Sequence, residues 1–337
     1  MIEIDGAEGE GGGQVLRNAC AMALITGESF HITRIRGGRE KPGLMRQHVT
    51  AIEAACAIGS AECEGLAIGA SEITFRPGRV VPGHYRFAIG TAGSCSLVLQ
   101  AVLPPLLLAG APSSLVLEGG THNMAAPPFD FLAGSFLPLL NRMGPRVTAR
   151  LIRHGFYPRG GGRIELDIAP APLRKLVLTS RGAPLHLRAT ALFAGIPFPI
   201  AERELATARQ ILGWPEESFA VRQLPDTEGP GNALLLEAGF EQVTEIMTGF
   251  GQRGITAEMV AKTAANRLAG YLESDAFAGP YLADQLLLPM ALAGGGRFTT
   301  VKPSPHSLTA AALIQRFLGR RVLIENNGAG VYEVEVG

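Results

Sequence analysis

The sequence predicts an α/β (α+β) protein built from repeated β-α-β-α-β-β modules, with a smaller α/β domain inserted between them. Apolar runs with the periods of strands and helices recur in the same order from residues 2 and 85, and partly again from 281. Glycines punctuate these runs, and the chain has 43 of them among 337 residues. Helices of such modules bury their apolar faces against neighbouring copies.

The first two modules are expected to contain the same elements. The first comprises a strand at 2–4, a helix at 14–25, a strand at 30–34, a helix at 43–58 and strands at 61–68 and 72–75. The second comprises a strand at 85–88, a helix at 94–108, a strand at 114–118, a helix at 128–143 and two further strands. Gly27 and Gly110 end the first helix of each module, because glycine tolerates the left-handed conformation found there.

The third module resumes after an interruption. Its expected elements are a helix at 281–293, a strand at 298–301, a helix beginning near His306 and strands at 322–325 and 331–336. In the interrupting segment, the sequence pattern predicts strands at 185–194, 219–224 and 233–240. It also predicts helices at 201–212 and 256–271, the last capped by Thr256. We therefore expect a large domain, 1–184 with 276–337, and a small inserted domain, 185–275.

The inserted domain shows no pattern that indicates catalysis. Its charged residues, such as Arg203 between Glu202 and Glu204, are typical of a solvated helix face. We expect all three side chains to face solvent.

Composition excludes several classes of protein. Lys+Arg and Asp+Glu both number 30, so a polyanion would need a local basic patch, and the 6% aromatic content argues against a broad base-stacking surface. The four cysteines form no CxxC pair, which argues against a zinc site or disulfide framework. The start of the chain is no signal peptide, and the apolar run 97–108 is too short for a membrane span. We expect a soluble, cytoplasmic protein that does not associate with membranes.

A glycine loop, Gly9–Gly13, separates the first strand from the first helix. Its backbone N–H groups could approach an anion at the helix start. A carboxylate beside such a cradle repels phosphate unless a divalent cation lies between them, so Glu10 is a candidate Mg²⁺ or Mn²⁺ ligand. A turn with a solvent-facing glutamate is an equally good interpretation.

Basic residues crowd the first module. The stretch 34–46 holds five cations and one acid, Glu40, and Arg17 lies just before it in the chain. Arginine forks suit phosphate oxygens, and the neighbouring glycines favour anion binding. The alternative is a solvated basic loop.

His306 follows Pro303, Ser304 and Pro305 at the expected start of a helix. The positive end of the helix dipole disfavours imidazolium, and a neutral imidazole can act as nucleophile or base. The alternative is a cap-region histidine bonded to backbone.

Two further features could form an adenine site. Pro127, Phe131 and Tyr281 could supply its apolar walls. Asp284 and Gln285, on the same helix as Tyr281, could supply its polar groups. Taken singly, Phe131 is more typical of a plain core position.

Together these motifs resemble the RNA 3′-terminal phosphate cyclase family. The matching stretches run in order along nearly the whole chain: Asp5-Gly6, Gly9–Gln14, Leu16-Arg17, Ile35-Arg36, Arg39, Lys41–Leu44, Arg46–His48, Gly93–Cys95, Gln100, His154–Pro158, Gly160–Gly162, Gly229–Asn232, Tyr281–Gln285 and His306. The resemblance implies a ligase that converts an RNA 3′-phosphate to a 2′,3′-cyclic phosphate with ATP, releasing AMP and pyrophosphate. It also implies the modular fold with an inserted domain.

The resemblance further implies a role for individual residues. His306 would be the nucleophile that becomes adenylated, and Glu10 would hold the divalent metal on ATP. The implied ATP-binding residues are Gln100, Pro127, Phe131, Tyr281, Leu282, Ala283, Asp284 and Gln285. The implied ligands of the triphosphate or the RNA terminal phosphate are Arg17, Arg36, Arg39 and Gln47.

The expected partners are ATP and RNA 3′-phosphate ends, with no obligate protein partner. One alternative is a non-catalytic relative acting in ribosome assembly, and the presence of His306 argues against it. Another is an enolpyruvyl transferase, which has related modules but neither a covalent histidine nor an ATP–metal site. The third is a nucleotide-binding scaffold of the same fold without turnover.

Overall fold

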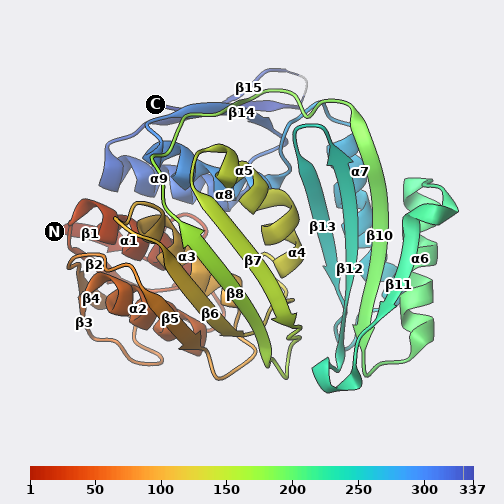
Figure 1. Ribbon diagram of the computed structural model, residues 1–337, viewed down its shortest axis with the longest axis horizontal. Helices are drawn as coiled ribbons and strands as arrows, with labels where there is room; N and C mark the ends of the chain where they lie inside the picture. The colour runs from red at the N-terminus through yellow and green to blue at the C-terminus, as the bar shows by residue number, and fades with distance from the viewer. Residues whose placement is uncertain (329) are drawn as a thin grey trace.

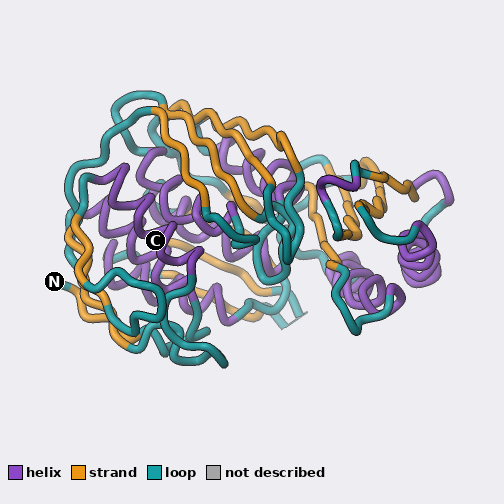
Figure 2. Tube along the Cα trace, turned by 90° about the horizontal axis from the view of Figure 1, so that it is seen from below, coloured by secondary structure: helices purple, strands orange, loops and turns teal. Residues whose placement is uncertain are grey.

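The computed structural model describes residues 1–328 and 330–337, and it confirms the mixed α/β class. Within these residues, four four-stranded sheets and their helices form a large body and a smaller unit beside it (Figure 1). In the large body, helices occupy the interior and strands lie around them (Figure 2). Among the described residues, no helix is both long enough and apolar enough to cross a membrane.

The first sheet has the strand order β1-β2-β4-β3. Its elements are β1 (Ile2–Asp5), α1 (Gly13–Thr26), β2 (Phe30–Thr33), α2 (Arg46–Gly59), β3 (Glu62–Glu64) and β4 (Ile73–Arg76). Strands β1 and β2 are parallel because a helix connects them, whereas β4 runs antiparallel to β2. Gly27 ends α1 with φ +78°, as predicted.

The second sheet has the equivalent order, β5-β6-β8-β7. Its elements are β5 (His84–Ala88), α3 (Cys95–Leu107), β6 (Ser113–Gly119), a second helical segment, β7 (Arg146–Arg153) and β8 (Gly162–Ala169). The helical segment is α4 (Phe129–Phe131), a π-helical stretch Leu132–Phe136 and α5 (Leu137–Arg142). α3 is almost entirely buried and packs against α1 and α2, which joins the helices of the first and second sheets.

The third sheet contains one strand that we did not predict. Its elements are β9 (Val177–Leu178), α8 (Pro280–Leu292), β14 (Gly296–Thr300), α9 (Pro305–Leu318), β15 (Val322–Asn326) and β16 (Tyr332–Val336), in the order β15-β16-β14-β9. Strand β9 pairs parallel with β14 and so takes the position that β1 and β5 hold in their sheets. Two residues are too few to show a strand period in sequence.

The smaller unit lies between β9 and α8 in the chain. Its elements are β10 (Pro184–Ala194), α6 (Phe198–Leu212), β11 (Phe219–Gln223), β12 (Gly231–Phe240), β13 (Thr244–Phe250) and α7 (Ala257–Leu272), with the sheet order β11-β10-β12-β13 and 3-10 turns at Glu216–Ser218 and Asp226–Glu228. Thr256 caps α7, as predicted, by accepting a hydrogen bond from the Met259 N–H at 3.2 Å. We did not predict β13, whose alternation is interrupted by the polar residue Glu245 and by Gly249.

The prediction for Glu204 is wrong. Arg203 is exposed and pairs with Glu258 at 2.6 Å, but the Glu204 carboxylate is buried against the sheet. It accepts a hydrogen bond from the Asn232 side chain at 2.6 Å, and burial raises its pKa to about 7. Glu204 belongs to the buried stripe of α6, three residues after Ala201 and one before Leu205.

A second buried carboxyl, Glu245, makes the stability of the fold depend on pH. Its Oε2 accepts the Gly279 N–H at 2.9 Å, its Oε1 has no partner among the described residues, and burial raises its pKa to about 8. The unfolded chain loses this proton near the ordinary value of 4.5, whereas the folded chain keeps it until about pH 8. The free energy of unfolding should therefore fall as pH rises through this window.

The substitution Glu245→Gln keeps an acceptor for Gly279 and removes the titration. We expect the variant to lose less stability than the wild type between pH 5 and pH 9, measured by urea unfolding at both values. Equal losses in the two proteins would show that Glu245 is not a neutral buried carboxyl.

Candidate active site

A cavity of about 680 Å³ opens between the large body and the smaller unit, and most of the predicted site residues line it. Those residues are Glu10, Arg17, Arg36, Arg39, Gln47, Gln100, Pro127, Phe131, Tyr281, Asp284, Gln285 and His306. Leu282 and Ala283 do not line it, because their side chains point into the core on the opposite face of α8. The structure thus brings together groups from α1, α2, α3, α8 and α9.

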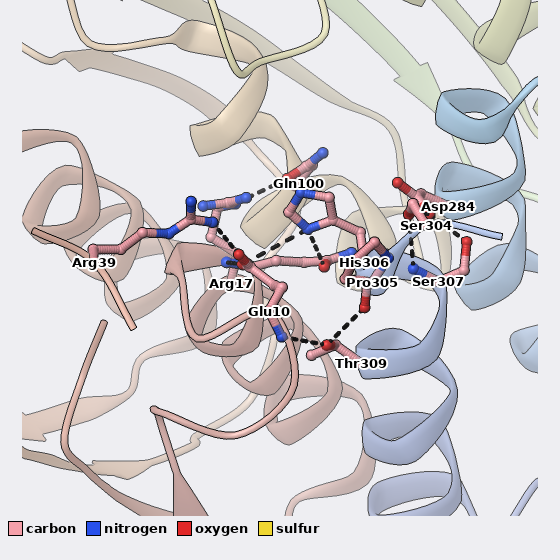
Figure 3. A network of polar contacts seen from close by, with 11 residues as sticks. Glu10, Arg17, Arg39, Gln100, Asp284, Ser304, Pro305, His306, Ser307 and Thr309 are labelled. Atoms are coloured by element: carbon pink, nitrogen blue, oxygen red, sulfur yellow. Dashed lines mark hydrogen bonds and ion pairs between the residues drawn. The ribbon is translucent and has the colours of Figure 1, made fainter. Parts of the chain in front are cut away.

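His306 lies in the first turn of α9, beside the start of α1 (Figure 3). Its Nδ1 is 2.8 Å from the Gln14 Oε1 and 3.7 Å from the Glu10 Oε1, both of which are hydrogen-bond acceptors. In the neutral imidazole Nδ1 therefore carries the proton, which leaves a lone pair on Nε2. The side chain is 41% exposed, so Nε2 is accessible from the cavity.

The carboxylate of Asp284 fixes the beginning of α9. Its Oδ1 accepts hydrogen bonds from the Ser304 hydroxyl at 2.7 Å and from the Ser307 hydroxyl (Figure 3). Ser304 is also the N-cap, and its Oγ accepts the Ser307 N–H at 3.2 Å. Burial raises the pKa of Asp284, and the two hydroxyl groups oppose this effect. The contacts join α8 to α9 and hold His306 in place.

Removing the cap hydroxyl should misplace the imidazole. We expect Ser304→Ala to lower stability by about 1 kcal/mol and to slow any reaction of His306 more than it weakens nucleotide binding. Thr256→Ala removes an equivalent cap from α7 and is the matched control. If both variants slow the reaction of His306 equally, the cap at α9 has no special role in positioning it.

Glu10 is not a solvent-facing residue, so that interpretation is wrong. Its side chain is 4% exposed, pairs with Arg39 and accepts the Gln14 N–H at 3.3 Å. Its own N–H donates to the Thr309 hydroxyl at 3.0 Å, and this hydroxyl donates to the Pro305 carbonyl at 2.9 Å. The glycine loop is therefore tied to the helix that carries His306.

The side chains of Arg17 and Arg36 are held by specific partners rather than solvated freely. The Arg17 Nε donates to the Gln100 Oε1 at 2.8 Å, and the Gln100 Nε2 donates to the Gln285 Oε1 at 3.0 Å. Burial lowers the pKa of Arg17 to about 10, so it remains charged at neutral pH. Arg36 donates to the carbonyls of Lys41 at 2.6 Å and Gly43 at 2.8 Å.

Comparison with known proteins decides the family. The family model described as RNA 3′-terminal phosphate cyclase matches residues 8–324. The chain belongs to the RNA 3′-terminal phosphate cyclase family. It is 53% identical over 319 residues to the RNA 3′-terminal phosphate cyclase of Koribacter versatilis (strain Ellin345), covering 94% of this chain and 90% of the relative. It is 51% identical over 339 residues to the enzyme of that name from Ralstonia nicotianae (strain ATCC BAA-1114 / GMI1000), covering 99% and 97%.

Within this cyclase-family site, one histidine was matched in the sequence but given no role. His48 is buried, and its Nδ1 accepts the Met45 N–H at 3.1 Å. Burial, Arg17 and Arg36 lower its pKa to about 3, so the ring is neutral. Its Nε2 therefore carries a proton and can donate a hydrogen bond at the edge of the cavity.

The smaller unit supplies a wall of the cavity that sequence reasoning missed. Phe250, Ile255, Met259 and Arg267 come from the end of β13, the following loop and α7. The Arg267 guanidinium lies 6.0 Å from the centroid of the Tyr281 ring. No local pattern in α7 separates these residues from an ordinary amphipathic helix.

Proposed function

We propose that the protein converts an RNA 3′-terminal phosphate to a 2′,3′-cyclic phosphate with ATP, through a covalent His306–AMP intermediate, releasing AMP and pyrophosphate. Its relatives at 51% and 53% identity carry the name of this enzyme. The single observation that carries the covalent mechanism is the hydrogen bond from His306 to Gln14. It fixes the tautomer and leaves Nε2 free in a cavity lined by arginines.

In the first step the Nε2 lone pair attacks the α-phosphorus of ATP. A P–N bond forms and the bond to the pyrophosphate oxygen breaks. Arg17, Arg36 and Arg39 offset the negative charge of the triphosphate as pyrophosphate leaves. Gln14 and Glu10 stabilise the Nδ1–H as the ring gains positive charge.

For the nucleotide base we propose the apolar side of the cavity. Tyr281 is 39% exposed and lines this side, as does Pro127 in the loop before α4. Phe131 is only 2% exposed, so it supports this side mainly from behind. Gln100 and Gln285 donate and accept hydrogen bonds beside it, and Asp284 positions α9.

The donor set fits a divalent cation held jointly by the protein and ATP. Among the described residues no three His, Cys, Asp or Glu side chains converge on one point, so Glu10 would be the protein ligand and phosphate oxygens and water would complete the shell. When bound, Mg²⁺ or Mn²⁺ would supply positive charge to the phosphates. Arg39, now paired with Glu10, would then be free to bind phosphate.

In the later steps a 3′-phosphate oxygen of RNA attacks the phosphorus of the adenylate and the P–N bond breaks. This regenerates the neutral imidazole and joins AMP to the RNA 3′-phosphate. The group that leaves in the next step is then AMP instead of a bare phosphate oxygen, which is a poor leaving group. The vicinal 2′-OH then attacks the RNA phosphorus, AMP leaves, and Nε2 of His306 can accept the hydroxyl proton. Gln47, whose Oε1 accepts the Ser94 N–H at 3.2 Å, would position the terminal phosphate with Arg36 and Arg39.

The proposal is tested with an RNA oligonucleotide labelled at its 3′-phosphate. With ATP and Mg²⁺ or Mn²⁺, we expect the label to become resistant to phosphatase, and omission of ATP should prevent this. A protein that binds ATP and RNA but never produces phosphatase-resistant ends would instead be the scaffold or the non-catalytic relative.

A further inference from the structure

A second hollow, of about 730 Å³, lies beside the loop that connects β7 to β8. This loop, residues 154–161, carries the glycine-rich motif that the site described above does not use. The lining of the hollow includes Gly90, Gly161 and Gly162 together with Arg153 and Arg159. Figure 1 shows the loop where the second sheet faces the smaller unit.

The charges at this hollow do not cancel. Of its two carboxylates, Glu118 pairs with Arg86 at 3.0 Å. Glu228 accepts from the His154 ring at 2.7 Å, but burial lowers the pKa of that histidine, so the single charge of Glu228 remains to face those of Arg153 and Arg159. Arg153 donates to the Thr227 carbonyl at 2.7 Å, a neutral acceptor.

Arg159 likewise donates to a carbonyl, that of Gly229, at 3.0 Å. Within the described part of the chain, neither Arg153 nor Arg159 forms a salt bridge with a carboxylate. A third arginine, Arg163, pairs with Glu165, but its Nε is buried and has no partner among the described residues. The hollow therefore has positive charge and spare N–H donors, which suit phosphodiester oxygens.

An exposed aromatic residue belongs to the same loop. Tyr157 is 71% exposed, more than the other residues among the large exposed hydrophobics of the structure. It lies two residues before Arg159. An exposed aromatic ring in the same loop as an arginine without a carboxylate partner is a combination by which proteins hold single-stranded nucleic acid.

The hollow is separated from the active-site cavity by one segment, residues 91–94. Thr91 lines the hollow, and Gly160 packs against Thr91 and Ala92 on that side. At the other end of the segment, Ser94 donates its N–H to Gln47, which lines the active-site cavity. An RNA chain whose terminal phosphate lies at Gln47 thus has a short route over this segment to the hollow.

We propose that the β7–β8 hollow binds the nucleotides upstream of the RNA 3′ end, with Arg153 and Arg159 on backbone phosphates and Tyr157 stacked on a base. The inference rests on the proposed function, because it takes the RNA end to lie in the main cavity. These three are binding residues remote from the chemistry. They make the enzyme prefer an oligonucleotide to the shortest 3′-phosphorylated substrate.

The test compares 3′-phosphorylated oligoadenylates of two and six nucleotides by fluorescence anisotropy without ATP. We expect the wild type to bind the six-mer more tightly. Tyr157→Ala should weaken binding of the six-nucleotide RNA by roughly 5-fold or more and leave binding of the dinucleotide unchanged. Arg153→Gln with Arg159→Gln should reduce the salt dependence of six-mer binding, with the slope of log K on log salt falling by about 1.4.

Arg150→Gln is the matched control, because Arg150 lies on β7 but pairs with Glu165 and Asp167. Tyr157 makes no hydrogen bond through its side chain to any other described residue, so its variant keeps the test independent of folding. Self-adenylation with ATP needs no RNA and should be equal in all variants.

If Tyr157→Ala and the double arginine variant bind the six-mer like the wild type, the inference is wrong. A wild type that neither adenylates itself nor forms cyclic ends would instead overturn the proposed function.

Discussion

Replacing His306 with alanine should abolish both self-adenylation and RNA cyclisation, lowering the turnover rate by roughly 10⁴-fold or more. The physical reason is the state of the two histidines that line the described part of the cavity. The hydrogen bonds of His306 leave the lone pair of its Nε2 exposed, whereas His48 presents an N–H. The measurement is the rate of phosphatase-resistant end formation at saturating ATP and RNA.

His31→Ala is a suitable control, because His31 on β2 pairs with Glu3 on β1 and does not line the cavity. It should leave turnover unchanged. ATP binding by His306→Ala, measured by calorimetry, should remain, since the arginines and Tyr281 are intact. A His306→Ala protein that still cyclises RNA at a comparable rate would disprove covalent catalysis by this residue.

Replacing Glu10 with glutamine should have the second-largest effect, a fall in self-adenylation of about 10²- to 10³-fold. The amide keeps the size of the side chain and can still accept the Gln14 N–H. It removes the negative charge that we propose binds the divalent cation and faces the Nδ1–H of His306. The variant should therefore require a higher concentration of Mg²⁺ or Mn²⁺ for half-maximal adenylation.

Glu8→Gln is the matched control in the same connection between β1 and α1. Glu8 is exposed and lies 3.7 Å from Arg316, outside the cavity lining. It should show wild-type metal dependence. If Glu10→Gln has an unchanged metal requirement, Glu10 is not the metal ligand, and its role is limited to the contacts with Arg39 and His306.

The sequence predicted the helix beginnings on which the site depends because local chemistry determines them. Ser304 and the prolines around it define the start of α9, and the Gly9–Gly13 loop defines the approach to α1. These two helix starts carry His306 and Glu10. The two starts meet because α1 packs against α9, a contact that only the structure reveals.

The parts that sequence reasoning missed depend on long-range contacts. Leu282 and Ala283 belong to a matched motif, yet the helical period turns them toward the core and away from the cavity. Glu204 looked like a solvated charge because its partner, Asn232, is 28 residues away on another element. The cavity wall from α7 depends on how the smaller unit is oriented, which no local pattern encodes.

The most direct test of the central claim is a single-turnover transfer. The protein is labelled with α-³²P ATP, freed of nucleotide and metal-bound pyrophosphate, and then mixed with 3′-phosphorylated RNA without ATP. We predict that acid-labile label maps to His306, and that its release as AMP matches the formation of cyclic RNA ends one for one. Label on another residue, or cyclic ends formed without loss of label, would contradict the mechanism.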